Sequence, residues 1–176
     1  NDGNNFVSQS FKKKASLAIV NKIQNKAYLK RQIKDKNTLK FLTKVSKVYR
    51  KNISTNIIAI TGSCGKTTLK ELLGNSLKKI SKVSISPKSY NNKYGVPLSL
   101  FNLNINDDYG VLEIGMDRKG EIDYLSNIIK PDVSVITNIN YAHIKNFKNI
   151  KQIALAKSEI IYNTRSNGYV ILNADD

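Results

Sequence analysis

The chain has 176 residues, enough for one compact domain or parts of two. No run of about 20 apolar residues is present, so no membrane span is expected, and the single cysteine excludes an internal disulfide framework and favours the cytoplasm. The formal charge of +16 favours anionic ligands, but the lysines are scattered without an aromatic-basic platform, so specific nucleic-acid binding is not expected.

The first segment of the chain is polar and basic. Residues 1–36 contain one strand-like run, SLAIV. The chain starts at Asn1 rather than at a methionine and stops at Asp176 directly after another strand-like run. We therefore expect it to be a piece of a longer protein, cut at both ends.

A helix is predicted directly after this basic segment. In TLKFLTKVSKVYRKN, residues 38–52, apolar side chains recur every three or four positions, which is the spacing of one helix face, and Thr38 is the expected N-cap. The residues of this face are Leu39, Leu42, Val45, Val48 and Tyr49.

From residue 57 onward, strand-like and helix-like segments alternate. Apolar runs favour strands at 57–61, 83–86, 109–115, 132–139 and 169–173, and helical periodicity favours helices at 66–80, 97–103, 120–130 and 149–163. The helix 66–80 is expected to bury a face made of Leu69, Leu72, Leu73 and Ile80. Such alternation indicates βαβ units, and hence a mostly parallel α/β sheet covered by helices on both faces.

A glycine-flanked polar turn separates the first of these strands from its helix. Backbone N–H groups at such a turn, with the positive end of the helix, hold phosphate oxygens. Lys66 can reach the outer phosphates of a nucleotide, and the Thr67 hydroxyl can ligate Mg²⁺. The turn is a shortened phosphate loop, because Ile60 stands where the usual first glycine would be; the alternative is an ordinary strand-to-helix turn. The predicted nucleotide-binding residues are Gly62, Ser63, Cys64, Gly65, Lys66, Thr67 and Thr68.

Two further chemical groups follow the next strands. Glu113 interrupts the apolar run VLEIG, and it is either a carboxylate paired with a cation or a strand-end residue that reaches solvent. His143, the one histidine, follows Asn138 in the segment after the next strand, and alone it would be an ordinary loop residue. Because ligands bind at the carboxyl edge of an open parallel sheet, we expect these residues to lie near the phosphate loop.

Lys157 lies among apolar residues of the last predicted helix. It is three or four positions from Ile153, Ala154, Ile160 and Ile161, which this helix is expected to bury. Either its stem covers the core while its amine reaches water, or the amine is a functional group that faces inward.

Five segments in this order closely resemble the Mur ligase family: ITGSCGKTT, NNKYGVPLSL, EIGMDRKGEIDYL, NINYAHIKNF and AKSEI. The resemblance extends over the whole chain. Met116, Asp117 and Arg118 stand where a small residue, Asn and His are more usual, and Lys148 and Asn149 replace a frequent Gly-Ser. These departures bear on substrate contacts rather than on the reaction type.

The resemblance implies ATP-driven amide formation in peptidoglycan precursor synthesis. The terminal carboxylate of UDP-N-acetylmuramoyl-tripeptide would attack the γ-phosphate to give an acyl phosphate and ADP. The amine of D-alanyl-D-alanine would then displace phosphate through a tetrahedral intermediate. The resemblance further implies a monomer that requires ATP and Mg²⁺, and we expect these 176 residues alone to form no amide product.

The resemblance also implies roles for individual residues. Lys66 would offset charge on the transferred group. Thr67 and Glu113 would hold one Mg²⁺, and His143 would help hold a second. Lys157 would join it as a carbamate, its amine linked to CO₂ to make an anionic oxygen ligand. The catalytic residues would thus be Lys66, His143 and Lys157.

The remaining implications concern the substrate side and the domains. Asn91 and Asn92 would line the substrate side, and Asn138 would be a nearby polar contact. Residues 1–36 would be the end of a UDP-sugar-binding domain, and residues 37–176 the N-terminal part of the central ATP-binding domain.

Three other functions remain open. The first is another Mur-type ligase, of the tripeptide-forming, folylpolyglutamate or cyanophycin type. The second is a P-loop ATPase or kinase module, although no clear Walker-B run ending in Asp is present. The third is a basic binding module without catalysis.

Overall fold

The computed structural model describes residues 2–141 and 146–175, which belong to two compact units. The units comprise residues 1–45 and 46–176, and the second contains the predicted alternation of strands and helices. His143 lies outside the described residues, so its predicted role stays a prediction.

The first unit contains a small two-stranded parallel sheet. β1 (Ala18–Val20) pairs with β2 (Gln32–Lys34), and Val7, Phe11 and Val20 form its buried apolar cluster. The other elements of this unit are the 3-10 helix η1 (Gly3–Phe6), the helix α1 (Val7–Lys12) and the 3-10 helix η2 (Lys26–Arg31). Only β1 is predicted from the sequence, because the other elements are too short to show a clear apolar period.

The helix α2 (Thr38–Lys51) begins in the first unit and continues into the second. The side chain of Asn37 accepts a hydrogen bond from the N–H of Lys40 at 2.9 Å, as an N-cap residue does. The predicted cap, Thr38, is therefore wrong by one residue.

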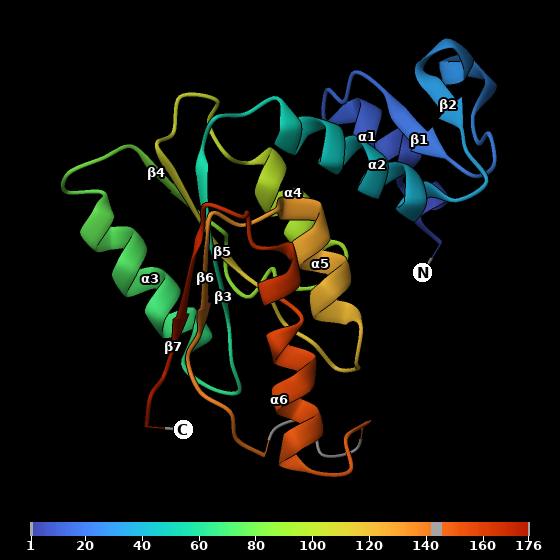
Figure 1. The fold of residues 1–176 in the computed structure, drawn as a ribbon. Helices are drawn as coiled ribbons and strands as arrows, with labels where there is room; N and C mark the ends of the chain where they lie inside the picture. The colour runs from blue at the N-terminus through green and yellow to red at the C-terminus, as the bar shows by residue number, and fades with distance from the viewer. Residues whose placement is uncertain (1, 142–145, 176) are drawn as a thin grey trace. The chain divides into compact units, whose positions relative to one another are not determined.

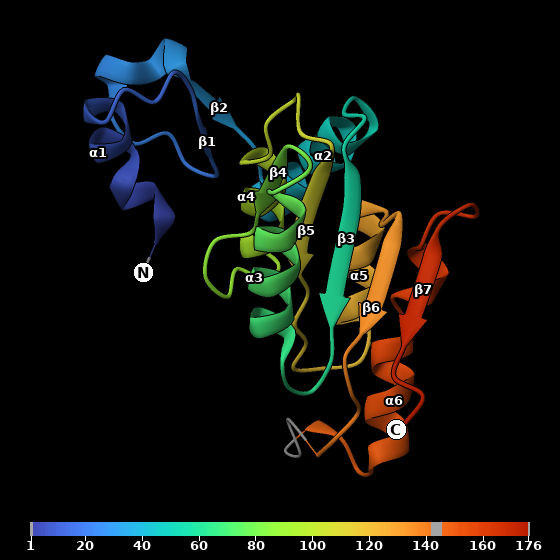
Figure 2. The same cartoon turned by 90° about the vertical axis from the view of Figure 1, so that its left-hand side faces the viewer.

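The second unit contains a five-stranded parallel sheet, which confirms the predicted fold class. The strand order is β4-β5-β3-β6-β7, so β3 lies at the centre between β5 and β6. The carboxyl ends of the strands therefore share one edge, toward which the arrowheads point in Figure 2. The strands are β3 (Asn56–Thr61), β4 (Val83–Ile85), β5 (Tyr109–Glu113), β6 (Val133–Ile136) and β7 (Tyr169–Leu172).

Helices cover both faces of this sheet, as Figure 1 shows. On one face, α3 (Lys66–Leu77) packs Leu69, Leu73 and Leu77 against the strands. The larger core lies on the other face. The helices that pack there are α4 (Gly95–Phe101), α5 (Glu121–Ile129) and α6 (Ile150–Ser158), and the 3-10 helix η4 (Ile161–Asn163) follows α6.

Two helices, α3 and α6, end at least three residues earlier than predicted. α3 ends at Leu77, so Ile80 lies beyond the helix and is 80% exposed. Leu72 is 64% exposed, because it lies about a quarter turn away from the i, i+4, i+8 line of leucines that faces the sheet. α6 ends at Ser158, and Ile161 of the predicted buried set is exposed.

α2 buries a cation where an apolar face is predicted. Its buried residues are Ser46 and Arg50, whereas Val48 is 60% exposed. The Arg50 guanidinium donates to the carbonyl oxygen of Ile129 at the end of α5, and at 2.7 Å to Asp132 before β6. This network fixes the end of α2 against the amino edge of the sheet, far along the strands from the phosphate loop.

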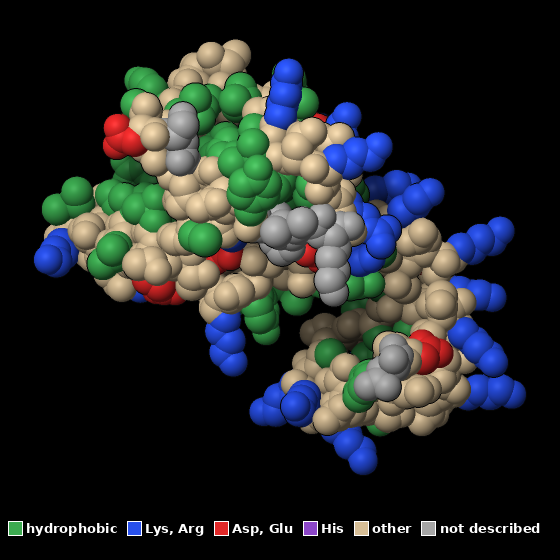
Figure 3. Space-filling view, turned by 90° about the horizontal axis from the view of Figure 1, so that it is seen from below, with side chains coloured by type: hydrophobic (Ala, Val, Ile, Leu, Met, Phe, Trp, Pro, Cys, Tyr) green, Lys and Arg blue, Asp and Glu red, His purple; other side chains and the backbone are tan. Residues whose placement is uncertain are grey.

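Basic side chains are dispersed on the surface. On the face drawn in Figure 3, Lys and Arg side chains project at several places. In the described part of the chain, no helix is both long enough and apolar enough to cross a bilayer.

Candidate active site

The loop after β3 contains two glycines with left-handed backbone angles. The φ angles are +148° at Gly62 and +77° at Gly65. A Cβ on Gly62 would lie 1.9 Å from Thr137 Oγ1, so no other residue fits without displacing Thr137. Gly65 is the N-cap of α3, and the N–H groups of the first helical turn have no partner within a helix. The loop therefore presents N–H donors at the positive end of α3, which is an anion site.

Asn138 holds this loop from the end of β6. Its Oδ1 accepts from the N–H of Cys64 at 2.9 Å, and its Nδ2 donates to the Cys64 carbonyl oxygen at 3.2 Å. Its backbone carbonyl accepts from the N–H of Ser63 at 2.9 Å. The structure thus confirms that the Asn138 segment lies against the phosphate loop. Because its amide is engaged with Cys64, the substrate contact remains a prediction.

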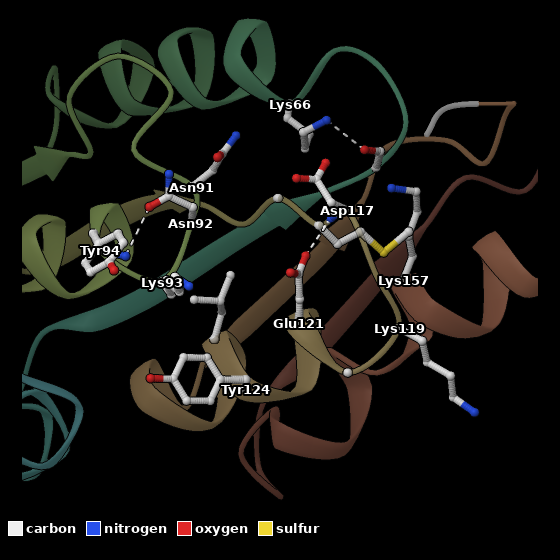
Figure 4. Close-up of a pocket in the computed structure, with 15 residues that line it drawn as sticks. Lys66, Asn91, Asn92, Lys93, Tyr94, Asp117, Lys119, Glu121, Tyr124 and Lys157 are labelled. Atoms are coloured by element: carbon white, nitrogen blue, oxygen red, sulfur yellow. Dashed lines mark hydrogen bonds between the residues drawn. The ribbon is translucent and has the colours of Figure 1, made fainter. Parts of the chain in front are cut away.

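Lys66 folds back over the same loop. Its Nζ donates to the carbonyl oxygens of Gly62 at 2.8 Å and Ser63 at 3.3 Å, and Figure 4 shows it above the cavity. A half-buried ammonium in this position can exchange carbonyl oxygens for phosphate oxygens, to which its hydrogen bonds are stronger.

Glu113 is buried at the end of β5, only 2% exposed, so the solvent-exposed alternative is wrong. The Thr67 hydroxyl donates to its Oε2 at 2.7 Å, and the Asn91 Nδ2 donates to its Oε1 at 2.7 Å. Within the described ranges, no Lys or Arg forms an ion pair with this carboxylate. A buried carboxylate that lacks a cationic side chain is a candidate ligand for a bound cation.

The two asparagines of NNKYGVPLSL have structural contacts. Asn91 packs on Gly115, whose N–H donates to the Asn91 carbonyl at 2.8 Å. The Oδ1 of Asn92 accepts from the N–H groups of Tyr94 and of Gly95, the first residue of α4, both at 3.0 Å. Both asparagines also line the cavity, and their contact with substrate stays a prediction.

Lys157 faces inward from α6, as predicted. It is 2% exposed and extends toward the phosphate loop in Figure 4. Burial, and to a lesser extent the nearby Lys66, lower its pKa to about 8, while Cys64 opposes the shift. Among residues 2–141 and 146–175, its amine has no hydrogen-bond or ion-pair partner. Such a group is costly to bury and is a functional candidate.

A cavity of ≈ 750 Å³ is lined by Lys66, Asn91, Asn92 and Lys157 of the residues described above. It opens between the phosphate loop, the start of α4 and the loop before α5 (Figure 4). Its lining contains both basic and acidic side chains. The charged and aromatic residues in this lining that sequence reasoning did not assign to the site are Lys93, Tyr94, Asp117, Lys119, Glu121 and Tyr124.

Glu159 is a further residue that the sequence did not reveal. Two positions after Lys157, its carboxylate accepts from the N–H of Gly120 at 2.8 and 3.0 Å and of Asp123 at 3.1 Å. It therefore joins the end of α6 to the first turn of α5. In the sequence, the only indication of Glu159 is that it belongs to the segment AKSEI, which was interpreted for Lys157.

A parallel sheet with a phosphate loop, a buried carboxylate beside the loop threonine and a buried lysine defines an α/β domain of the P-loop class. The sequence model of the Mur ligase middle domain matches residues 60–176. The chain belongs to the Mur ligase family, and the resemblance noted from its motifs is confirmed.

Individual relatives match over nearly the whole chain. The UDP-N-acetylmuramoyl-tripeptide–D-alanyl-D-alanine ligase of Buchnera aphidicola is 38% identical over 174 residues, which are 99% of this chain and 38% of that protein. The crystal structure of MurF from Acinetobacter baumannii matches with a TM-score of 0.85 and 35% identity, over 96% of this chain and 37% of that one. The MurF ligase of Thermotoga maritima, solved in complex with ADP, matches with a TM-score of 0.87 and 32% identity, over 99% of this chain and 40% of that one. The chain thus spans about 38% of the length of the curated relatives it matches.

Proposed function

We propose that this chain is part of an ATP-dependent ligase that joins D-alanyl-D-alanine to UDP-N-acetylmuramoyl-tripeptide. The observation that carries the proposal is the Thr67–Glu113 pair, 2.7 Å apart at the phosphate loop. The relatives named above, whose names state this reaction, support the choice of substrates. The ADP-bound relative supports ATP as the nucleotide.

The phosphate loop would hold the nucleotide through the first turn of α3. Because the N–H groups of Ser63 and Cys64 bond to Asn138, the donors placed for phosphate are those from Gly65 onward. Lys66 would leave the Gly62 carbonyl and offset charge on the transferred phosphoryl group.

The pair Thr67 and Glu113 fits Mg²⁺. A hydroxyl and a carboxylate are hard oxygen ligands, and Mg²⁺ is commonly held by one or two protein oxygens together with substrate phosphates and water. Among the described residues, no three His, Cys, Asp or Glu side chains are grouped so that they could hold a metal ion. A Mg²⁺ site made of one or two protein oxygens, phosphates and water does not require such a group. When bound, Mg²⁺ would neutralise charge on the phosphates.

Lys157 would act as a carbamate, in which its neutral amine attacks the carbon of CO₂, a C–N bond forms and the nitrogen loses a proton. A pKa near 8 makes about a tenth of the amine neutral at pH 7, roughly 300-fold more than the ordinary value of 10.5 would allow. The anionic product would also relieve the repulsion between Lys157 and Lys66. Together with His143, the carbamate would ligate a second Mg²⁺.

The reaction proposed has two steps. The tripeptide carboxylate attacks the γ-phosphorus and ADP leaves, which gives an acyl phosphate. The dipeptide amine then attacks the acyl carbon, the tetrahedral intermediate expels phosphate, and the amine loses a proton. The cavity beside Asn91 and Asn92 would receive the tripeptide end, and residues 1–36 would belong to a domain that binds its UDP-sugar.

The proposed function is tested on the gene product that contains this chain. Phosphate release and the mass of the product are measured with ATP, Mg²⁺, UDP-N-acetylmuramoyl-tripeptide and D-alanyl-D-alanine. Release should require all four, and omission of the dipeptide should abolish the product. Phosphate release with ATP alone would instead favour a plain ATPase.

A ligase with a different acceptor is the second candidate. The pseudomurein peptide ligase type C of Methanothermus fervidus matches with a TM-score of 0.64 and 27% identity, which shows that the fold occurs in another peptide ligase. The same assay separates the two candidates when single amino acids, including glutamate, compete with D-alanyl-D-alanine as the acceptor.

The carbamate is tested at a single position. Lys157→Arg keeps length and charge but cannot bind CO₂, so a ligand would be replaced by a repelling cation. We expect its turnover to be lost, and wild-type turnover to fall when CO₂ is stripped from the buffers. A near-normal variant together with a wild type indifferent to CO₂ would return Lys157 to a packing role.

A further inference from the structure

A second fully buried lysine lies on α3, one turn beyond the phosphate loop. Lys70 is 0% exposed, so its amine does not reach solvent as the amines of most surface lysines do. Its Nζ donates to the carbonyl oxygen of Ser86 at 2.7 Å and to that of Lys88, and lies 3.1 Å from Glu71 Oε1. These three partners use all three donors of the ammonium group.

The two carbonyls belong to the loop between β4 and α4. Ser86 is buried, and its Oγ accepts from the N–H of Glu113 at 3.3 Å. Farther along the same loop, Asn91 donates to the Glu113 carboxylate, and its carbonyl receives the N–H of Gly115. Lys70 thus bonds this loop to α3. The same loop contacts both the backbone and the side chain of Glu113.

The contacts close a ring around the carboxylate. Thr67, three residues before Lys70 on the same helix, donates to one Glu113 oxygen, and Asn91 donates to the other. The orientation of the carboxylate therefore depends on how the loop lies against α3, and Lys70 bonds the two together. Lys70 itself does not line the cavity, so its influence on the site is indirect.

We propose that Lys70 is a positioning residue, which holds the 86–91 loop against α3 so that Ser86 and Asn91 orient Glu113 toward Thr67. This inference rests on the proposed Mg²⁺ role of Thr67 and Glu113. Residues that orient a metal ligand typically change metal affinity about 10- to 100-fold when they are replaced.

The test compares Lys70→Met with Lys78→Met, a matched control at the exposed residue that directly follows the same helix. Hydrogen exchange is measured without metal. In Lys70→Met, the amides of Glu113 and Gly115, which bond to the loop, should exchange at least about tenfold faster, while central β3 amides stay unchanged. A uniform change across the sheet, or no change, would overturn the inference whether or not metal binds.

Metal affinity is measured by titrating Mn²⁺, read by electron paramagnetic resonance, in the presence of ADP. Lys70→Met should bind Mn²⁺ about 10- to 100-fold more weakly, Lys78→Met should match the wild type, and Glu113→Gln should lose the site. Loss in Glu113→Gln with wild-type affinity in Lys70→Met would overturn only the role of Lys70. Unchanged affinity in Glu113→Gln would overturn the Mg²⁺ site itself.

Asn91→Ala keeps the test decisive if Lys70→Met does not fold. Asn91 is half-buried in the loop, so its truncation leaves the core intact. If the ring orients Glu113, this variant should bind Mn²⁺ about as weakly as Lys70→Met, because the substitution removes the hydrogen bond from the loop to the carboxylate. Wild-type affinity in Asn91→Ala would exclude the ring as the means by which Glu113 is oriented.

Discussion

Lys157→Met should stabilise the fold at neutral pH, although it removes a group proposed for function. Burial, and then repulsion from Lys66, lower the pKa of Lys157 from 10.5 to about 8. This shift corresponds to about 3 kcal/mol of unfolding free energy when the amine is protonated. Methionine has a similar length and no charge, so most of that penalty should disappear.

The effect of Lys157 on stability depends on pH with a definite sign. The folded chain holds the Lys157 proton less tightly than the unfolded chain does, so between about pH 8 and 10.5 the unfolded chain binds more protons. The unfolding free energy of the wild type therefore gains from this group as pH rises through that window, and the penalty is complete below about pH 8. The advantage of Lys157→Met should be about 3 kcal/mol at pH 7 and near zero above pH 10.5.

The assay is urea unfolding at several pH values between 7 and 10.5 in buffers free of CO₂. Lys151→Met, at an exposed position on the same helix, is the matched control and should follow the wild type at every pH. Only differences between variants are compared, because other groups titrate in the same window. A Lys157→Met protein no more stable than the wild type at pH 7 would refute the reasoning. An advantage that persists unchanged at pH 10.5 would refute it as well.

Three further outcomes are expected. Lys66→Ala should lower turnover of the gene product about 10²- to 10³-fold without a loss of fold, as measured by phosphate release and circular dichroism; activity within a few-fold of wild type would exclude Lys66 from the phosphate site. Gly62→Ala should destabilise the chain by at least about 2 kcal/mol in urea unfolding, because the new Cβ would meet Thr137 Oγ1 at 1.9 Å; a stability equal to wild type would show that the loop can shift. Asp132→Asn should lower the free energy of unfolding by about 3 kcal/mol in the same assay, because it leaves the buried Arg50 without its anion. A loss below about 1 kcal/mol, which is what an exposed ion pair contributes, would contradict that account.

The sequence predicted the second unit better than the first. Continuous apolar strands and periodic helices of ten or so residues carry strong local signals, so the parallel sheet and its phosphate loop could be inferred. The first unit consists of short elements that gain their order from one another, and only β1 was visible. Helix ends were missed where an apolar residue continues the period beyond the last turn, as Ile80 does after α3.

The two buried lysines show where sequence reasoning about the site reaches its limit. Lys157 was identified because its own helix places it three and four residues from buried apolar neighbours, so the signal is local. Lys70 carries no such signal in KTTLKELL, since its neighbours on the helix include polar side chains, and 29 Lys and Arg residues make one more lysine unremarkable. Its burial results from a loop that lies 16 and 18 residues farther along the chain and brings two carbonyl oxygens to the ammonium. A contact of that kind is determined by the tertiary fold, so a residue that positions the site without touching its ligands becomes visible only in the structure.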